Sequence, residues 1–203
     1  MAPNNIRIET AKAINETAIS KRVDFVFLHQ TGASHTQGRN EMCQVFGNEQ
    51  FHKSDRILMV DGDIGFEPED VTALLEDDLP IVSGVYRGIM QERVMPVVFE
   101  WAEVNGKRRL LPIDKEPENQ VFKASGVGAG FLMLHRDVVN DVYERYGHPY
   151  PWFAEDVHDG QGFSEDLSFC LRAQECGYDI HVDSRVQVAH YKSVKLGGRK
   201  DEG

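Results

Sequence analysis

Residues 57–60 are four consecutive apolar residues, and they run directly into Asp61-Gly62-Asp63. A short unbroken apolar run is typical of a strand that is buried on both faces, as in a sheet covered by helices. In an extended chain Asp61 and Asp63 point to the same side, while Gly62, which has no Cβ, lets the backbone bend. The stretch therefore predicts a central strand that ends in a pair of carboxylates.

Two neighbouring carboxylates repel each other unless a cation lies between them. Asp61 and Asp63 are therefore candidate ligands for Mg²⁺ or Mn²⁺, hard ions that proteins bind through carboxylate oxygens and that substrate phosphates complete. The alternative is a turn with two solvated acids, because Asp-Gly is a common turn pair. The triplet alone leaves both interpretations open.

The first half of the chain alternates helical and extended patterns, which favours an α/β fold with a mainly parallel sheet. Ile8, Ala11 and Ile14 recur near helical spacing, and Pro68 suits the first turn of a helix. We expect helices over residues 5–20, 39–46 and 68–75, and strands over residues 23–28, 56–61 and 81–86.

The second half begins with a hairpin signal, Asn105-Gly106, between two extended runs. Residues 1–196 are expected to form one domain and residues 197–203 a flexible tail. We expect the hairpin over residues 94–112, strands over 121–124, 131–134 and within 178–190, helices over 137–146 and 164–177, and a loop over 148–163.

Composition limits the class of protein. The chain has 203 residues and a net charge of −11, which argues against a broad surface for a nucleic acid polymer but not against a single nucleotide. Three cysteines without metal-site spacing fit a reducing, cytoplasmic setting, and Cys170 and Cys176 are expected to be small buried thiols. No apolar stretch is long enough to cross a membrane, and no signal-peptide pattern opens the chain.

Ser164-Glu165-Asp166 marks the start of a predicted helix. Ser164 suits the N-cap, and the helix dipole favours ionised acids in the first turn. Such acids often serve helix electrostatics alone. The functional alternative is a general base, a carboxylate directed at an acceptor hydroxyl.

Three other segments have two interpretations each. His190 closes an apolar strand, where a neutral imidazole could join a metal site or be an ordinary residue. The glycine-rich segment 124–130 resembles a dinucleotide fingerprint, but a strand follows it instead of a helix. We expect its glycines to let the backbone approach a substrate. The aromatic loop 149–153 either stacks on a sugar or base, or covers the core.

Taken together, the motifs resemble the GT-A family of nucleotide-sugar glycosyltransferases, and most closely its bacterial and phage members related to glycosyltransferase family 2. The resemblance covers residues 5–192 and implies a Rossmann-like three-layer sandwich with an added hairpin. It rests on Arg39-Asn40, the Asp61-Gly62-Asp63 strand, residues 80–86, residues 126–134, Trp152-Phe153, residues 164–170, Gly177-Tyr178 and residues 186–190.

The resemblance implies a role for each candidate residue. Asp63 would bind Mn²⁺ or Mg²⁺ directly, Asp61 would bind it through water or contact the ribose, and His190 would be a further metal or phosphate contact. Asp166, with Glu165 as the rival, would be the base of an inverting transfer. Arg39 and Tyr86 would support the pocket of a UDP- or GDP-sugar donor. The acceptor would be a glycan or another hydroxyl compound.

Two alternatives stay open, a nucleotidyltransferase and a degenerate, non-catalytic nucleotide- or carbohydrate-binding module. The first usually has a basic glycine-rich loop near its N-terminus, and none is found here. The second is kept because family members normally begin with an apolar strand that holds the base, which this sequence lacks before its first helix. The donor sugar, the base, the acceptor and the oligomeric state are not predicted.

Overall fold

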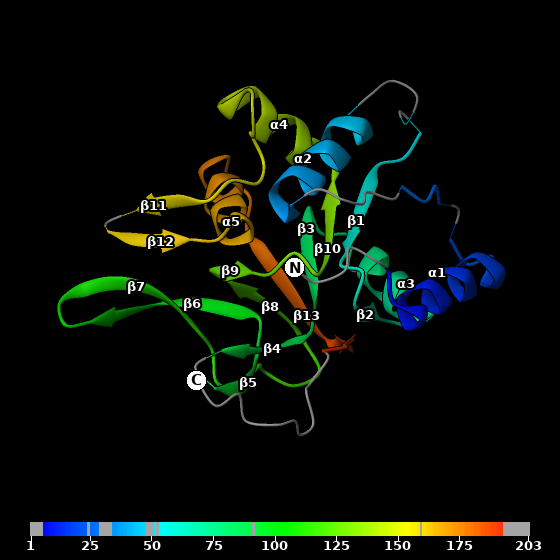
Figure 1. Ribbon diagram of the computed structural model, residues 1–203, viewed down its shortest axis with the longest axis horizontal. Helices are drawn as coiled ribbons and strands as arrows, with labels where there is room; N and C mark the ends of the chain where they lie inside the picture. Colours follow the sequence, from blue (N-terminus) through cyan, green and yellow to red (C-terminus); the bar gives the residue numbers. More distant parts are fainter. Residues whose placement is uncertain are drawn as a thin grey trace, which may run out of the picture.

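A five-stranded sheet with helices on both faces forms the centre of the computed structural model (Figure 1). The model describes residues 6–23, 25–28, 34–47, 51, 53–90, 92–158 and 160–192, without the side chain of His158. The predicted tail over residues 197–203 lies outside these ranges. In spatial order the strands are β1 (Arg56–Val60), β10 (Phe131–His135), β3 (Ile81–Val85), β13 (Ile180–Gln187) and β8 (Val121–Ala124).

The sheet is mainly antiparallel, so the prediction of a mainly parallel sheet is wrong. Only β3 and β13 pair in parallel, while the other three pairings are antiparallel. The reason is that β10 inserts between β1 and β3 in the opposite direction. An apolar run indicates burial on both faces of a strand but does not reveal the direction of its neighbours. Nevertheless β1, β3 and β13 all run the same way.

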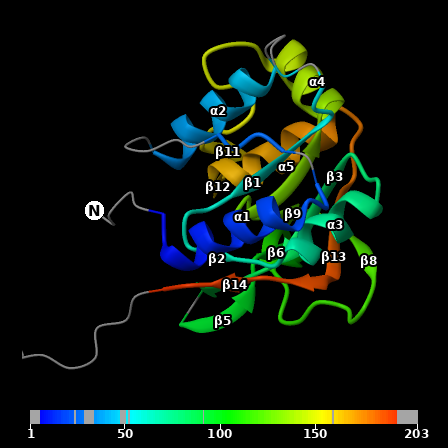
Figure 2. The same cartoon turned by 90° about the vertical axis from the view of Figure 1, so that its right-hand side faces the viewer.

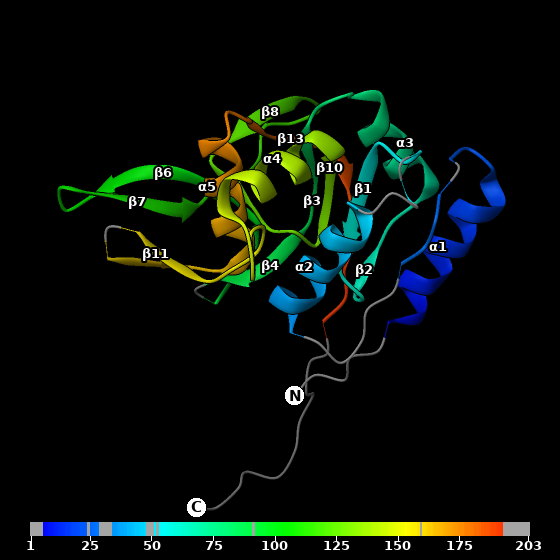
Figure 3. The same cartoon turned by 90° about the horizontal axis from the view of Figure 1, so that it is seen from above.

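Helices cover both faces of this sheet. The helices α1 (Ile8–Ser20) and α3 (Pro68–Glu76) lie on one face, and α2 (His35–Phe46), α4 (Arg136–Tyr146) and α5 (Glu165–Glu175) lie on the other (Figures 2 and 3). Alternate residues of β10 pack into the two hydrophobic cores, one on each face of the sheet. Leu132 and Leu134 pack with the α2–α4–α5 side, whereas Phe131 and Met133 pack with the α1–α3 side. The predicted layering is therefore present.

Capping residues set where the helices begin. The helix α2 starts at His35, four residues before the predicted Arg39, because the Ser34 side chain accepts a hydrogen bond from the Gln37 amide. The helix α3 begins at Pro68, where Glu67 and Asp70 form a reciprocal capping box. The expected strand over residues 23–28 is not formed by its described residues, Val23 and 25–28.

Hairpins extend from the sheet. The predicted one consists of β6 (Val98–Val104) and β7 (Lys107–Pro112), and both turn residues, Asn105 and Gly106, have positive φ as a type I′ turn requires. The segment predicted as a loop over residues 148–163 also contains a hairpin. The remaining short strands are β2 (Ile64–Gly65), β4 (Arg87–Met90), β5 (Arg93–Pro96), β9 (Gly126–Val127), β11 (Asp156–His158), β12 (Gln161–Phe163) and β14 (Ala189–His190).

Two cysteines belong to the core. Cys43 and Cys170 are fully buried, and burial raises the pKa of the Cys170 thiol to about 12, so that it stays protonated. The interpretation as a small buried thiol is confirmed for Cys170, whereas Cys176, for which it was also expected, is only half-buried. None of the described helices is both long and apolar enough to cross a membrane.

Candidate active site at the carboxyl ends of three strands

The candidate residues gather where β1, β3 and β13 end, at one edge of the sheet. Asp61 and Asp63 follow β1, Tyr86 follows β3, and His190 follows β13 in β14. The short pairing of β14 with β2 places His190 opposite Ile64, next to Asp63. Ligands of open α/β sheets bind outside the carboxyl ends of such strands.

Asp63 and His190 form a pair that suits a divalent cation. The His190 Nε2 lies 3.4 Å from the Asp63 Oδ1, and its Nδ1 lies 2.7 Å from the Arg87 carbonyl oxygen. A carbonyl only accepts, so Nδ1 carries a proton, and Nε2 of a neutral ring is free to bind a metal. Neighbouring ligands of one octahedral Mn²⁺ or Mg²⁺ lie about 3 Å apart, so the pair fits such an ion.

Lys192, which the sequence analysis did not single out, is a second partner of Asp63. Its Nζ lies 2.7 Å from the Asp63 Oδ2, and half of the lysine side chain is exposed. Within the described ranges there is no cluster of three or more histidine, cysteine or acidic residues that could hold a metal. A two-residue site is nevertheless typical of Mg²⁺ that is completed by substrate phosphates. The sequence signal that could have pointed to Lys192 is its position two residues after His190, which ends a strand.

Arg39 joins the two acidic motifs. Its guanidinium donates from Nη2 to the Asp61 Oδ1 and from Nη1 to the Glu165 Oε1, both at 2.8 Å. Burial acts to lower the pKa of Arg39, but Asp61, Asp166 and Glu165 together raise it above its usual value. Arg39 therefore remains charged and holds the start of α5 against the end of β1.

The turn of the alternative interpretation is present, since the Ile64 amide donates to the Asp61 carbonyl at 3.0 Å, but both carboxylates have cationic partners within the chain. The backbone of the turn is also held. The Gly62 carbonyl accepts from the Arg7 amide at 2.7 Å and from the Thr10 hydroxyl at 3.1 Å, both from the start of α1. The helix α1 thus fixes the loop that carries the candidate metal ligand.

Glu165 and Asp166 have different surroundings. Glu165 is held by Arg39, with 14% of its side chain exposed. Asp166 is half-buried, and its Oδ1 accepts from the Ser164 hydroxyl and the Leu167 amide. Among the described residues, no hydrogen bond to the Asp166 Oδ2 is found. The described contacts of Glu165 likewise involve only its Oε1, so the two acids differ in that Glu165 is ion-paired with Arg39 and Asp166 is not.

Tyr86 is a buried residue of the site. Its hydroxyl oxygen accepts a hydrogen bond from the Gly130 amide at 3.2 Å. Burial, followed by the charges of Asp61 and Asp166, raises the pKa of Tyr86 well above its usual value, so the phenol stays neutral. Direct access of a donor to Tyr86 is limited, since the residue is only 6% exposed.

The glycines of segment 124–130 make room for side chains of the chain itself. A Cβ on Gly128 would lie 1.9 Å from the Tyr86 hydroxyl oxygen and 2.7 Å from the Val97 Cγ1, and one on Gly130 would lie 2.9 Å from the Tyr86 ring. The expectation that these glycines let the backbone approach a substrate therefore needs correction. Gly128 and Gly130 let the backbone approach Tyr86.

We expect Gly128→Ala to lower the free energy of unfolding by about 3 kcal/mol, since the added methyl overpacks a buried contact. Tyr86→Phe, which removes the nearest atom, should recover part of this loss in the double variant. Urea unfolding measures both. The matched control is Gly162→Ala, where a Cβ meets nothing within 4 Å and φ is not positive. Equal losses for the two alanine variants would contradict the packing argument.

The aromatic loop 149–153 mainly covers the core. Trp152 and Phe153 are 4% and 0% exposed, and Phe153 stacks on Phe169 of α5. Asn40 holds the loop, since its side-chain amide donates to the Phe153 carbonyl and accepts from the Trp152 and Phe153 amides. Of the two interpretations, the core role applies to these two rings.

Comparisons with known proteins find similarity in structure but none in sequence. No family model matches the chain, and no curated protein matches it. The crystal structure of A197 from STIV, a viral protein, matches with a TM-score of 0.59 and 15% identity, over 95% of this chain and 83% of that one. The crystal structure of GalNAc-T7 with UDP, GalNAc and Mn²⁺ matches with a TM-score of 0.48 and 12% identity, over 91% of this chain and 36% of that one. The likeness to A197 concerns the fold alone and accords with a mixed α/β architecture.

Proposed function

We propose that the chain is a metal-dependent glycosyltransferase, which transfers a sugar from a nucleoside-diphosphate sugar to a hydroxyl acceptor with inversion. One observation carries the proposal. The pair Asp63–His190 and the carboxylate Asp166 lie at the same edge of the sheet, and Arg39 links their elements by bonding Asp61 and Glu165. A cation site and a base are the two parts that such a transfer needs.

On the donor side, Asp63 and His190 would hold Mn²⁺ or Mg²⁺, which supplies positive charge to the leaving diphosphate. Lys192 lies beside Asp63 and is half exposed, so its ammonium can turn from the carboxylate to a phosphate oxygen. Asp61, held by Arg39, faces the donor with 27% of its side chain exposed. Both UDP- and GDP-sugars fit this chemistry.

On the acceptor side, Asp166 would take the proton of the attacking hydroxyl through Oδ2. Its Oδ1 is fixed by the Ser164 hydroxyl and the Leu167 amide, which orient the carboxylate without neutralising it. Glu165 would position α5 through Arg39. Since one carboxylate would assist one in-line displacement, inversion is the outcome that this arrangement favours.

A non-catalytic nucleotide-binding module is the second candidate, and one contact favours it. The Lys192 ammonium already neutralises Asp63 at 2.7 Å, in the region that a metal would occupy. Under this alternative a nucleoside diphosphate should bind equally well with and without a divalent ion.

The test is a thermal shift with UDP and GDP in the presence of Mn²⁺, Mg²⁺ or EDTA. A ligand at about 100 times its Kd stabilises by about 2.7 kcal/mol. For a chain of this length that raises Tm by about 5–10 °C. We expect this rise for at least one of the two nucleotides with metal, and none with EDTA. Asp63→Ala should abolish it.

The matched control is Asp114→Ala, which removes an exposed aspartate whose ion pair with Arg93 lies on the surface. This variant should keep the full shift. A shift that persists in EDTA would favour the non-catalytic module, and a much larger shift with UTP than with UDP would favour a nucleotidyltransferase. No shift with either diphosphate would refute the proposal.

A further inference from the structure

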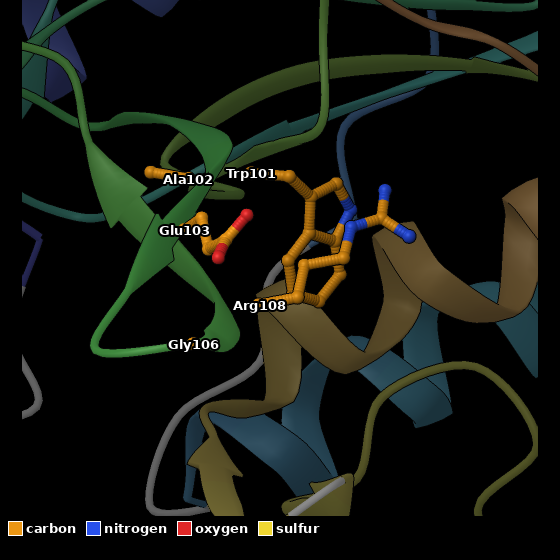
Figure 4. A pocket seen from close by; sticks show the side chains of 5 residues that line it. All are labelled: Trp101, Ala102, Glu103, Gly106 and Arg108. Atoms are coloured by element: carbon orange, nitrogen blue, oxygen red, sulfur yellow. The ribbon is translucent and has the colours of Figure 1, made fainter.

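A pocket of about 480 Å³ lies on the β6–β7 hairpin, outside the strand ends described above. It is lined by Trp101, Ala102, Glu103, Gly106 and Arg108 (Figure 4). Trp101 and Glu103 are two residues apart on β6 and so share one face of the hairpin, and Arg108 pairs with Glu103 across the strands. An aromatic ring, a carboxylate and a guanidinium therefore surround one hollow.

Arg108 stacks on Trp101, with its guanidinium carbon 4.5 Å from the ring centroid (Figure 4). Within the described part of the chain, neither Arg108 nor its neighbours Lys107 and Arg109 forms an ion pair with a carboxylate. Lys107 and Arg109 point to the opposite face of the hairpin, so Arg108 is the cation of the three that lines the pocket. The exposed Arg108 guanidinium, without an ion pair in the described part of the chain, is therefore available to an anionic group from outside.

The pocket is connected to the candidate base. Trp101 contacts the ring of Phe163 edge-on, with centroids 6.2 Å apart, and the buried Phe163 directly precedes Ser164. The Gln161 side chain accepts from the Leu110 amide at 3.2 Å and donates to the Leu110 carbonyl at 3.1 Å. The two hairpins β6–β7 and β11–β12 therefore lie side by side next to α5 (Figure 1).

We infer that this pocket binds an acidic saccharide, a chain of sugars with ring carboxylates, as the acceptor of the transfer proposed above, on which this assignment rests. Trp101 offers apolar surface to a sugar ring, and the planar fork of Arg108 matches a carboxylate. Glu103 accepts hydrogen bonds from sugar hydroxyls. The net charge of −11 disfavours non-specific binding of anions elsewhere on the chain.

The experiment is a fluorescence titration of the whole chain, without nucleotide or metal, using tetragalacturonate as the acidic probe and cellotetraose as the neutral one. The chain has two tryptophans, and Trp152 is buried with its Nε1 bonded to the Val139 carbonyl. A change in emission therefore reports on Trp101. We expect a saturable change with tetragalacturonate and at least tenfold weaker binding of cellotetraose.

Arg108→Gln should weaken tetragalacturonate binding at least tenfold. The matched control is Arg145→Gln, since Arg145 also lies over an aromatic ring, Tyr146, but pairs with Glu175, the last residue of α5. The control should bind as the wild type does. Both arginines are exposed, so both variants should keep the wild-type Tm.

The assignment is overturned if tetragalacturonate causes no saturable change, if cellotetraose binds as tightly, or if Arg108→Gln and Arg145→Gln behave alike. Arg108→Gln should also keep the metal-dependent shift with UDP or GDP. A failure of that shift in the wild type together with intact tetragalacturonate binding would refute the transferase and leave the saccharide site in place.

Discussion

Replacing Asp166 with asparagine is expected to slow the transfer reaction by about 10²–10⁴-fold, the usual effect of a general base. Asparagine keeps the shape and the Oδ1 that accepts from the Leu167 amide, but its nitrogen cannot take a proton. Release of UDP or GDP from a panel of UDP- and GDP-sugars, with water or an added saccharide as acceptor, measures the rate. The metal-dependent thermal shift should remain, since Asp166 lies on the acceptor side.

Glu165→Gln is the informative companion to this variant. It removes the charge that Arg39 holds, so its main effect should be on stability, with a smaller loss of rate. If Glu165→Gln abolishes turnover and Asp166→Asn does not, the two carboxylates have exchanged roles. If Asp166→Asn loses nucleotide binding as well, Asp166 belongs to the metal or structural part of the site.

Arg39→Gln is expected to lower the free energy of unfolding by about 3 kcal/mol. Breaking a buried ion pair from one side typically costs 3–5 kcal/mol, because the remaining charge is left without a partner. The lower end applies here, since 27% of the Asp61 side chain is exposed. Arg39→Lys should recover little, because one ammonium cannot bond Asp61 and Glu165 with the fixed fork of a guanidinium. Urea unfolding measures each loss.

Arg145→Gln again serves as the control, because its pair with Glu175 is half-exposed on both sides, and exposed ion pairs contribute little to the free energy of unfolding. The double variant Arg39→Gln/Glu165→Gln should be less destabilised than the sum of its single changes, since the uncompensated charge is removed. An Arg39→Gln loss no larger than that of the control would mean that Arg39 does not hold the two motifs together.

The elements that bear the candidate site could be predicted from local patterns. The apolar run before Asp61, the Ser164 cap before Glu165 and the apolar strand before His190 each fix a side chain at the end of an element. What no local pattern contains is the partner of each side chain. The bond of Arg39 to Asp61 spans 22 residues and its bond to Glu165 spans 126. The pairing of Lys192 with Asp63 spans 129.

The direction of the strands escaped prediction for a related reason. The helix α3 between β1 and β3 correctly indicates that these two strands run the same way. It does not indicate that β10, which is separated from β3 by residues 86–130, enters between them. The hairpin β11–β12 was missed because its strands are three residues long and include Gly162, so that no alternating pattern arises.

The two hydrogen bonds between Gln161 and the Leu110 peptide group have a mechanical consequence. A side-chain amide occupies the place that a neighbouring strand's peptide would take, so β7 and β12 separate only when both bonds break. That costs about 1–3 kcal/mol. The β6–β7 hairpin is therefore tied to a residue three positions before Ser164, the N-cap of α5. A saccharide bound at the outer hairpin would thus lie on a strand whose hydrogen-bonded neighbour leads directly into the first turn of α5.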